Sequence, residues 1–365
     1  MSSRDLGERG NSGVLFRNGT MDFLAGWLLG YAQQGGLSPG SLLDTFAQIR
    51  DGDPGSWVAA FERTATSAQR RAEAAGRDGD RAVAALEWQA ACVAWRATLG
   101  MLDPADVRAR EVSDQVAVTF RHFLRARDIP LTSTPVDFGE ASLPAYQSVG
   151  AERAERLAIV IGGGDTCVED LWFLGGAALV AAGWPVLLAD LPGQGSTPYQ
   201  GLYFGADTEA GMRRLFAAIR ERGFAGETVL VGWSGGGLFV TKYASIADAS
   251  DQLRAVVASA PMYDMGEAMR EAFPGILRRD PSSPILRAAL AVARRNKVLK
   301  VSLAKYQWQF GSDAITSVVD RFAELGRVDL DAIDGIRPRV WLRSTAPAAA
   351  LRTARSATSP WRWRW

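Results

Sequence analysis

Two spacings of apolar residues divide the sequence. Up to about residue 130, apolar side chains recur three and four positions apart, as in SWVAAFERTATSAQRRAEAA (56–75) and RAVAALEWQAACVAWRATLGML (81–102). This is the spacing of helices that bury one face. The pattern therefore predicts an all-helical N-terminal domain over residues 1–130.

From Pro130 onward, short apolar runs alternate with helical segments. Helices are predicted at 168–182, at 209–222 and directly after residue 234. Strands are predicted at LTSTPVDF (131–138), LPAYQSVG (143–150), RLAIVIGGG (156–164), WPVLLADL (184–191), TVLVGWS (228–234), RAVVASAP (254–261) and RPRVWL (337–342). Strands that alternate with helices form a mostly parallel sheet with right-handed crossovers. We expect one α/β core over residues 131–342.

Two further segments depart from this alternation. Residues 262–325 return to a helical pattern broken by prolines, and an insertion at this place would cover the carboxyl edge of the sheet as a lid. Residues 343–365, rich in arginine and tryptophan, show no strand or helix period. This tail is interpreted as an out-of-frame translation or the end of a truncated gene, or alternatively as a segment that binds membranes or nucleic acid.

Charge and cysteine content narrow the classes of partner. The 41 lysines and arginines nearly balance the 40 acidic residues, so no overall field gathers nucleic acid or an anionic membrane. Cys92 and Cys167 lack the spacing of a metal site or a disulfide framework. The apolar window 173–191 is divided by Gly183 and Pro185 into a helix and a strand, which argues against a membrane span. We expect a cytoplasmic protein that binds a small molecule and uses no metal.

One pentapeptide carries a specific chemical signal. Gly232, Ser234 and Gly236 form G-x-S-x-G between a predicted buried strand and a predicted helix, the context of a nucleophile elbow. There the serine hydroxyl projects outward, and the amide of Gly235 at the helix N-terminus can stabilise an oxyanion. Ser234 is therefore the candidate nucleophile.

A second oxyanion donor is expected in the glycine-rich loop after the strand at 156–164. We favour the amide of Gly164, with Gly163 as the alternative. The same loop matches a dinucleotide fingerprint poorly, because Cys167 stands where a small residue is needed. No cofactor is therefore predicted. Trp233, beside the serine, is the candidate pocket residue, whereas Trp172 and Phe173 are expected in the core.

Four motifs, GGGDTCVEDLWF, LADLPGQGSTP, GWSGGG and YQWQFG, resemble the branch of the α/β-hydrolase superfamily that includes 2,6-dihydroxypseudooxynicotine hydrolase, the fungal heptaketide-shortening hydrolases and the fermentation-respiration switch protein. The resemblance covers roughly residues 20–342. It implies an α/β-hydrolase fold with a helical N-terminal domain and a helical lid. It also implies hydrolysis of a carbon–carbon bond in an acyl ketone, an ester or a thioester, a place in secondary metabolism, and a homodimer as one assembly.

The resemblance also implies a triad, and only its serine transfers, onto Ser234. No acidic residue follows Asp334, and the single histidine, His122, belongs to the N-terminal helices, where we expect it to serve packing. A serine hydroxyl is a weak nucleophile without a neighbouring base. Three hypotheses therefore stay open: a serine hydrolase of reduced activity, a protein of the same fold that binds a ligand or acts as an isomerase or cyclase, or a nonfunctional, shortened copy of a hydrolase gene.

Overall fold

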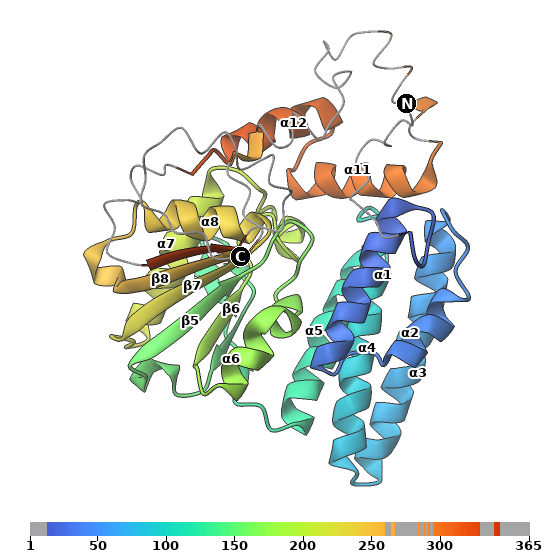
Figure 1. Ribbon diagram of the computed structural model, residues 1–365, viewed down its shortest axis with the longest axis horizontal. Coiled ribbons are helices and arrows are strands. Elements are labelled where there is room, and N and C mark those ends of the chain that lie inside the picture. The colour runs from blue at the N-terminus through green and yellow to red at the C-terminus, as the bar shows by residue number, and fades with distance from the viewer. Residues whose placement is uncertain are drawn as a thin grey trace.

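The computed structural model describes residues 13–259, 264–266, 284, 288, 291–292, 295–328 and 339–343. Its N-terminal part, through residue 126, is helical, as predicted (Figure 1). The elements there are α1 (Gly19–Tyr31), η1 (Ala32–Gln34), α2 (Pro39–Phe46), α3 (Pro54–Arg77), α4 (Arg81–Met101) and α5 (Ala109–Ala126). The predicted tail at 343–365 lies outside the described residues except for Arg343.

Local sequence explains where these helices begin. The Asn18 and Ser38 side chains accept backbone amides at the starts of α1 and α2, and Asp80 does the same for α4. Such side chains satisfy donors that a helix leaves free in its first turn. Helices α3 and α4 then pack as a hairpin, with the indole of Trp57 donating to the Ala97 carbonyl at 2.8 Å.

In the part of the chain that the structure describes, seven strands form a sheet in the order β1-β4-β6-β5-β7-β8-β9. Strands β5 to β9 pair in parallel, and β1 and β4 pair antiparallel at one edge. The bounds are β1 (Leu131–Ser133), β4 (Ala145–Ser148), β5 (Arg156–Ile161), β6 (Val186–Ala189), β7 (Glu227–Trp233), β8 (Leu253–Ser259) and β9 (Arg339–Arg343). The mostly parallel sheet predicted from the alternation is confirmed.

Two of the predicted strands are each divided in two. Strands β2 (Val136–Phe138) and β3 (Ala141–Leu143) form a separate two-stranded sheet. Pro135 separates β1 from β2, and Pro144 separates β3 from β4. Because proline has no amide to donate, it interrupts a ladder in the middle of a sheet. The prediction of one continuous strand at 131–138 and of another at 143–150 is therefore wrong, because each range contains parts of two strands.

Helices on both faces bury the sheet. Alternate residues of β5 belong to different hydrophobic clusters: Leu157, Ile159 and Ile161 pack with α7 (Asp207–Glu221) and α8 (Gly235–Ala244), while Ala158 and Val160 pack with the N-terminal helices. A strand buried on both faces reads as a continuous apolar run. One hydrophobic cluster therefore extends from the N-terminal helices to the sheet, and a domain boundary at residue 130 stays a prediction.

The helix predicted at 168–182 contains a kink. A π-helical turn, η3 (Trp172–Gly176), precedes α6 (Ala177–Ala181), and Gly175 inside it has φ 129°. The strand β6 follows at Val186. The division of the apolar window 173–191 into helix and strand is thus confirmed, and no helix within the described residues is long and apolar enough to cross a membrane.

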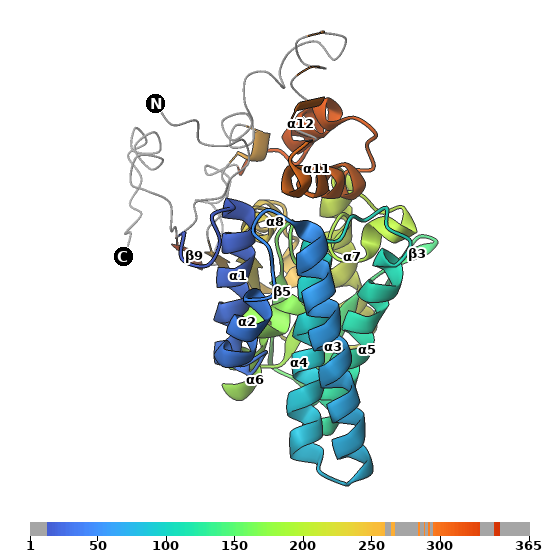
Figure 2. The same cartoon turned by 90° about the vertical axis from the view of Figure 1, so that its right-hand side faces the viewer.

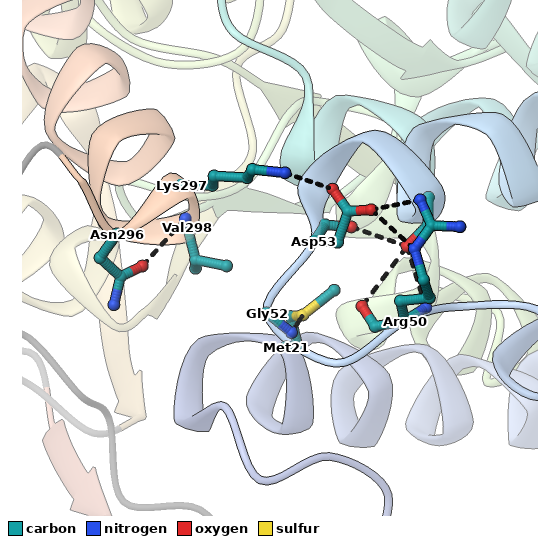
Figure 3. A network of polar contacts seen from close by, with 8 residues as sticks. Met21, Arg50, Gly52, Asp53, Asn296, Lys297 and Val298 are labelled. Atoms are coloured by element: carbon teal, nitrogen blue, oxygen red, sulfur yellow. Dashed lines mark hydrogen bonds and ion pairs between the residues drawn. The ribbon is translucent and has the colours of Figure 1, made fainter.

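Helices α11 (Lys297–Gln309) and α12 (Ile315–Glu324) lie over one end of the molecule in both views (Figures 1 and 2). The start of α11 contacts the N-terminal helices: Lys297 Nζ lies 3.6 Å from Asp53 Oδ1, and Asp53 also pairs with Arg50 (Figure 3). Near its middle, Lys305 Nζ donates to the Gly100 carbonyl of α4 at 2.6 Å. Helix α11 is thus attached to the N-terminal helices at two places.

Shorter turns connect the remaining elements. They are η2 (Ala151–Arg153), η4 (Thr197–Gln200) and η5 (Ala249–Asp251). Of the predicted lid at 262–325, the described residues include α11, α12 and a few positions before them, whereas Pro274 and Pro281 lie outside the described residues. What the structure describes of this segment is largely helical, as expected.

Candidate active site

Ser234 stands at the bend between β7 and α8. Its backbone has φ 53° and ψ −122°, a left-handed conformation that a residue with a side chain seldom adopts. The bend is fixed by hydrogen bonds on both sides: the Ser234 amide donates to the Ser259 carbonyl at 3.0 Å, and the Gly237 amide donates to the Ser234 carbonyl at 2.8 Å. Ser234 is exposed although its neighbours in α8 are buried.

The glycines on either side of the bend leave no room for a side chain. A Cβ placed on Gly232 would lie 2.4 Å from the Gly236 carbonyl oxygen, and one on Gly236 would lie 2.3 Å from the Gly162 carbonyl oxygen. Helix α8 therefore passes directly over the end of β5. A side chain at either of these positions of G-x-S-x-G would therefore clash with the backbone.

The loop after β5 lies against the serine. A Cβ on Gly163 would come within 2.9 Å of Ser234 Cβ and 3.2 Å of the Gly235 nitrogen. The Gly164 nitrogen in turn lies 3.6 Å from the position of a Cβ on Gly235. The structure thus brings together Ser234, Gly235 and Gly164, the three residues predicted for nucleophile and oxyanion hole. Gly235 begins α8, where the helix dipole favours negative charge.

The predicted aromatic residues occupy two different surroundings. Trp172 and Phe173 are buried in the core, where Phe173 stacks on Tyr31 at 4.7 Å, so the core role expected for them is confirmed. Trp233 is half-buried, and its Nε1, beside Gly175, is buried with no hydrogen-bond partner among the described residues. Its ring also packs against the cluster shared with the N-terminal helices. A pocket role for Trp233 stays a prediction.

His122 takes part in packing between helices. On α5 its ring stacks on Trp88 of α4, with the centroids 4.3 Å apart and the planes at 17°. The Arg125 guanidinium lies 3.2 Å from its Nδ1. Burial, together with Arg125, lowers the pKa of the imidazole. These contacts agree with the packing role expected for the only histidine of the chain.

A buried acidic cluster that the sequence did not predict lies behind the oxyanion loop. It consists of Glu169, Asp170 and Asp190, which are 6%, 1% and 1% exposed. Arg96 of α4 pairs with Asp170, Nε to Oδ2, at 2.7 Å. Burial, reinforced by neighbouring carboxylates, raises the pKa of Glu169 and raises that of Asp190 well above its usual range. These two carboxyls therefore tend to keep their protons.

Within the ranges that the structure describes, no group of three histidine, cysteine or acidic side chains is arranged to hold a metal ion. One Asp190 carboxyl oxygen accepts the Val168 amide at 3.0 Å, and Glu169 accepts the Tyr146 hydroxyl at 3.0 Å. These contacts lie around the loop that carries Gly164, whereas Asp190 Oδ1 is buried with no hydrogen-bond partner among the described residues.

Comparison with known proteins agrees with this architecture. A family model described as "alpha/beta hydrolase fold" matches residues 159–284. The solved structure of 2,6-dihydroxy-pseudo-oxynicotine hydrolase is similar with a TM-score of 0.65 at 13% identity, covering 86% of this chain and 79% of that one. AbyA5 is similar with a TM-score of 0.60 at 16% identity, covering 91% and 84%. The chain therefore has the α/β-hydrolase fold, and the resemblance found in the sequence is confirmed.

Curated relatives are named hydrolases of fungi. The chain is 28% identical over 279 residues to the hydrolyase ccsE of Aspergillus clavatus, covering 69% of this chain and 63% of that protein. It is 32% identical over 179 residues to the 20-hydroxy-prefusarin hydrolase FUS2 of Gibberella moniliformis, covering 46% and 42%. The chain thus spans about half the length of these relatives.

Proposed function

We propose that this protein is a hydrolase that uses Ser234 as its nucleophile. The observation that carries the proposal is the exposed serine at φ 53° between a buried strand and a helix, beside the amides of Gly235 and Gly164. Attack on a carbonyl carbon by the Ser234 hydroxyl places negative charge on the carbonyl oxygen, and two fixed amides stabilise such a charge.

The proposed substrate is a small molecule that contains a carbon–carbon bond next to a ketone, an ester or a thioester. The names of the similar proteins, 20-hydroxy-prefusarin hydrolase and 2,6-dihydroxy-pseudo-oxynicotine hydrolase, support hydrolysis of small organic molecules. Fungal relatives of this kind support a place in secondary metabolism. Helices α11 and α12 are the proposed lid, because Gln309 at the end of α11 contacts the Gly164 carbonyl.

The surroundings of His122 favour a second candidate. The only imidazole of the chain stacks on Trp88 in the α4–α5 pair, and general-base assistance is worth about 10²- to 10⁴-fold in rate. A protein of this fold without such assistance would hydrolyse slowly, or would bind a ligand or act as an isomerase or cyclase. The proposed hydrolase is therefore expected to turn over slowly.

Covalent labelling separates the two functions. We expect a fluorophosphonate probe to label the wild-type chain slowly, with the modification on Ser234 by peptide mass spectrometry. Ser234→Ala should remove the label, and His122→Ala should keep it because that ring packs on Trp88. A panel of small esters and thioesters then measures turnover. A folded wild-type protein that takes no label would refute the nucleophile and favour the non-hydrolytic function.

A further inference from the structure

The backbone carbonyls of the oxyanion loop, residues 162–166, all accept hydrogen bonds. Gln194 donates to Gly162 and Gly163, and Gln309 donates to Gly164. Arg96 donates to the Asp165 carbonyl, and the Gly195 amide donates to the Thr166 carbonyl at 3.2 Å. Three of these donors are side chains from distant segments: the turn after β6, the end of α11 and the middle of α4. The loop is therefore held from its carbonyl side.

Gln194 contacts the peptide that carries the Gly164 amide. Its side chain is fully buried, and its Oε1 accepts the Leu191 amide at 2.8 Å, which fixes the direction of the carboxamide. Its Nε2 then donates to the Gly162 oxygen at 2.5 Å and to the Gly163 oxygen at 3.0 Å. The Thr166 hydroxyl donates to the same Gly163 oxygen at 3.1 Å.

Peptide geometry links this contact to the proposed oxyanion hole. The Gly163 carbonyl and the Gly164 amide belong to one planar trans peptide, so their C=O and N–H bonds point in opposite directions. Fixing the Gly163 oxygen on Gln194 therefore fixes the direction of the Gly164 N–H on the opposite side. Gly163 packs against Ser234, and the Gly164 nitrogen lies near Gly235.

Gln309 fixes the following peptide. Its side chain is 8% exposed, and its Nε2 donates to the Gly164 carbonyl and, at 3.3 Å, to the Gly193 carbonyl. Its own carbonyl accepts the Phe204 amide at 3.0 Å. The end of α11 is thus joined both to the oxyanion loop and to the turn that carries Gln194.

We propose that Gln194 and Gln309 are positioning residues that aim the Gly164 amide at the oxygen of a tetrahedral intermediate on Ser234. This inference rests on the proposed function of Ser234. Loss of one oxyanion donor costs about 10²- to 10³-fold in kcat. A donor that is still present but no longer aimed is expected to cost on the order of 10-fold or more, on the same scale.

The test uses Gln194→Met and Gln309→Met, with Gln307→Met as the matched control. Gln307 lies on the same helix as Gln309, but its Nε2 donates to the Asp313 carbonyl away from the loop. The first readout is the rate constant for fluorophosphonate labelling of Ser234. The second is the Kd for phenylboronic acid, which forms a tetrahedral adduct with a serine hydroxyl and needs no catalytic base at equilibrium.

We expect both Gln194→Met and Gln309→Met to lower the labelling rate constant and weaken boronate binding about 10-fold or more, and Gln307→Met to leave both unchanged. On any ester that the protein turns over, kcat should fall while KM stays the same. If the two glutamines served stability alone, the variants would lower the melting temperature without lowering kcat at constant KM. If Gln194→Met does not fold, Gln309→Met alone decides the outcome.

Gln194→Glu supplies a readout that depends on pH. Glutamate keeps an acceptor for the Leu191 amide and, only when protonated, one donor for the loop carbonyls. Its labelling rate relative to wild type should therefore rise as the pH is lowered. A wild-type chain that neither labels nor binds boronate would refute the proposed function itself. A wild-type chain that labels while Gln194→Met and Gln309→Met behave like Gln307→Met would overturn only the positioning roles.

Discussion

Replacing Arg96 by methionine removes the guanidinium that pairs with Asp170 in the buried acidic cluster. Arg96 Nε lies 2.7 Å from Asp170 Oδ2, and the two side chains are 13% and 1% exposed. Methionine keeps much of the aliphatic volume but leaves Asp170 near Glu169 and Asp190 without the cation. The Asp165 carbonyl also loses its guanidinium donor.

The expected cost follows from this burial. Breaking a buried ion pair by removing one partner costs about 3–5 kcal/mol, because it leaves an uncompensated charge. Each kcal/mol lowers Tm by about 2–4 °C in domains of a few hundred residues, so Tm should fall by roughly 6–20 °C. An exposed pair gives the matched control: Glu209 and Arg213 on α7 lie 3.2 Å apart and are 47% and 52% exposed. Arg213→Met should cost less than about 1 kcal/mol.

Urea denaturation at pH 7, followed by circular dichroism, measures both variants. The double variant Arg96→Met/Asp170→Asn removes both charges and keeps an oxygen for the Cys167 amide, which Asp170 accepts at 2.9 Å. It should be more stable than Arg96→Met alone, because no buried charge is left unpaired. An Arg96→Met variant that loses no more stability than Arg213→Met, or a double variant less stable than Arg96→Met, would refute a stabilising role for this buried pair.

Three further predictions concern the strand ends around the site. Ser234→Gly should raise Tm in calorimetry, because it releases about 1–3 kcal/mol of backbone strain at φ 53°, less the entropy of glycine; an unchanged or lower Tm would contradict this. Gly236→Ala should lower the free energy of unfolding by about 1–3 kcal/mol or more, because its Cβ would meet the Gly162 oxygen at 2.3 Å, and wild-type stability in urea would contradict that clash. Burial raises the pKa of Asp190 in the folded protein. Above the unfolded pKa of about 4, the native state therefore binds more protons than the unfolded state. The stability of the wild type consequently falls as the pH rises toward the folded pKa. Urea titrations from pH 4 to 8 should therefore show Asp190→Asn gaining stability relative to wild type as pH rises, and a constant difference would argue against a protonated Asp190.

The bend at Ser234 could be predicted because its cause is local. A Cβ added to Gly232 or Gly236 would lie only 2.4 or 2.3 Å from a backbone oxygen, about one and a half bond lengths, so both positions require glycine. The same five residues carry the serine. The alternation of strands and helices is likewise a pattern of neighbouring residues, and it predicted the sheet. The apolar pattern did not predict the strand divisions, because Pro135 and Pro144 interrupt the ladder inside runs whose other residues favour strands.

The supports of the oxyanion loop could not be predicted, because they join residues far apart in sequence. Gln309 and Gly164 are separated by 145 positions, and periodicity carries no information on such a contact. Gln309 lies in YQWQFG, one of the motifs of the resemblance, but no role followed from the residues. Arg96 did give a signal, a charged residue within the apolar run ACVAWRATLG of a buried helix, which indicates a buried partner.

The attachment of α11 to the loop has a consequence for protein engineering. Exchanging the lid helices between relatives is an obvious way to change substrate preference. In this protein such a graft would also exchange the residue that contacts the Gly164 carbonyl, so a chimera could lose rate for a reason unrelated to the shape of its pocket. Grafts that retain Gln309 and the turn carrying Gln194 would separate recognition of the substrate from the chemical step.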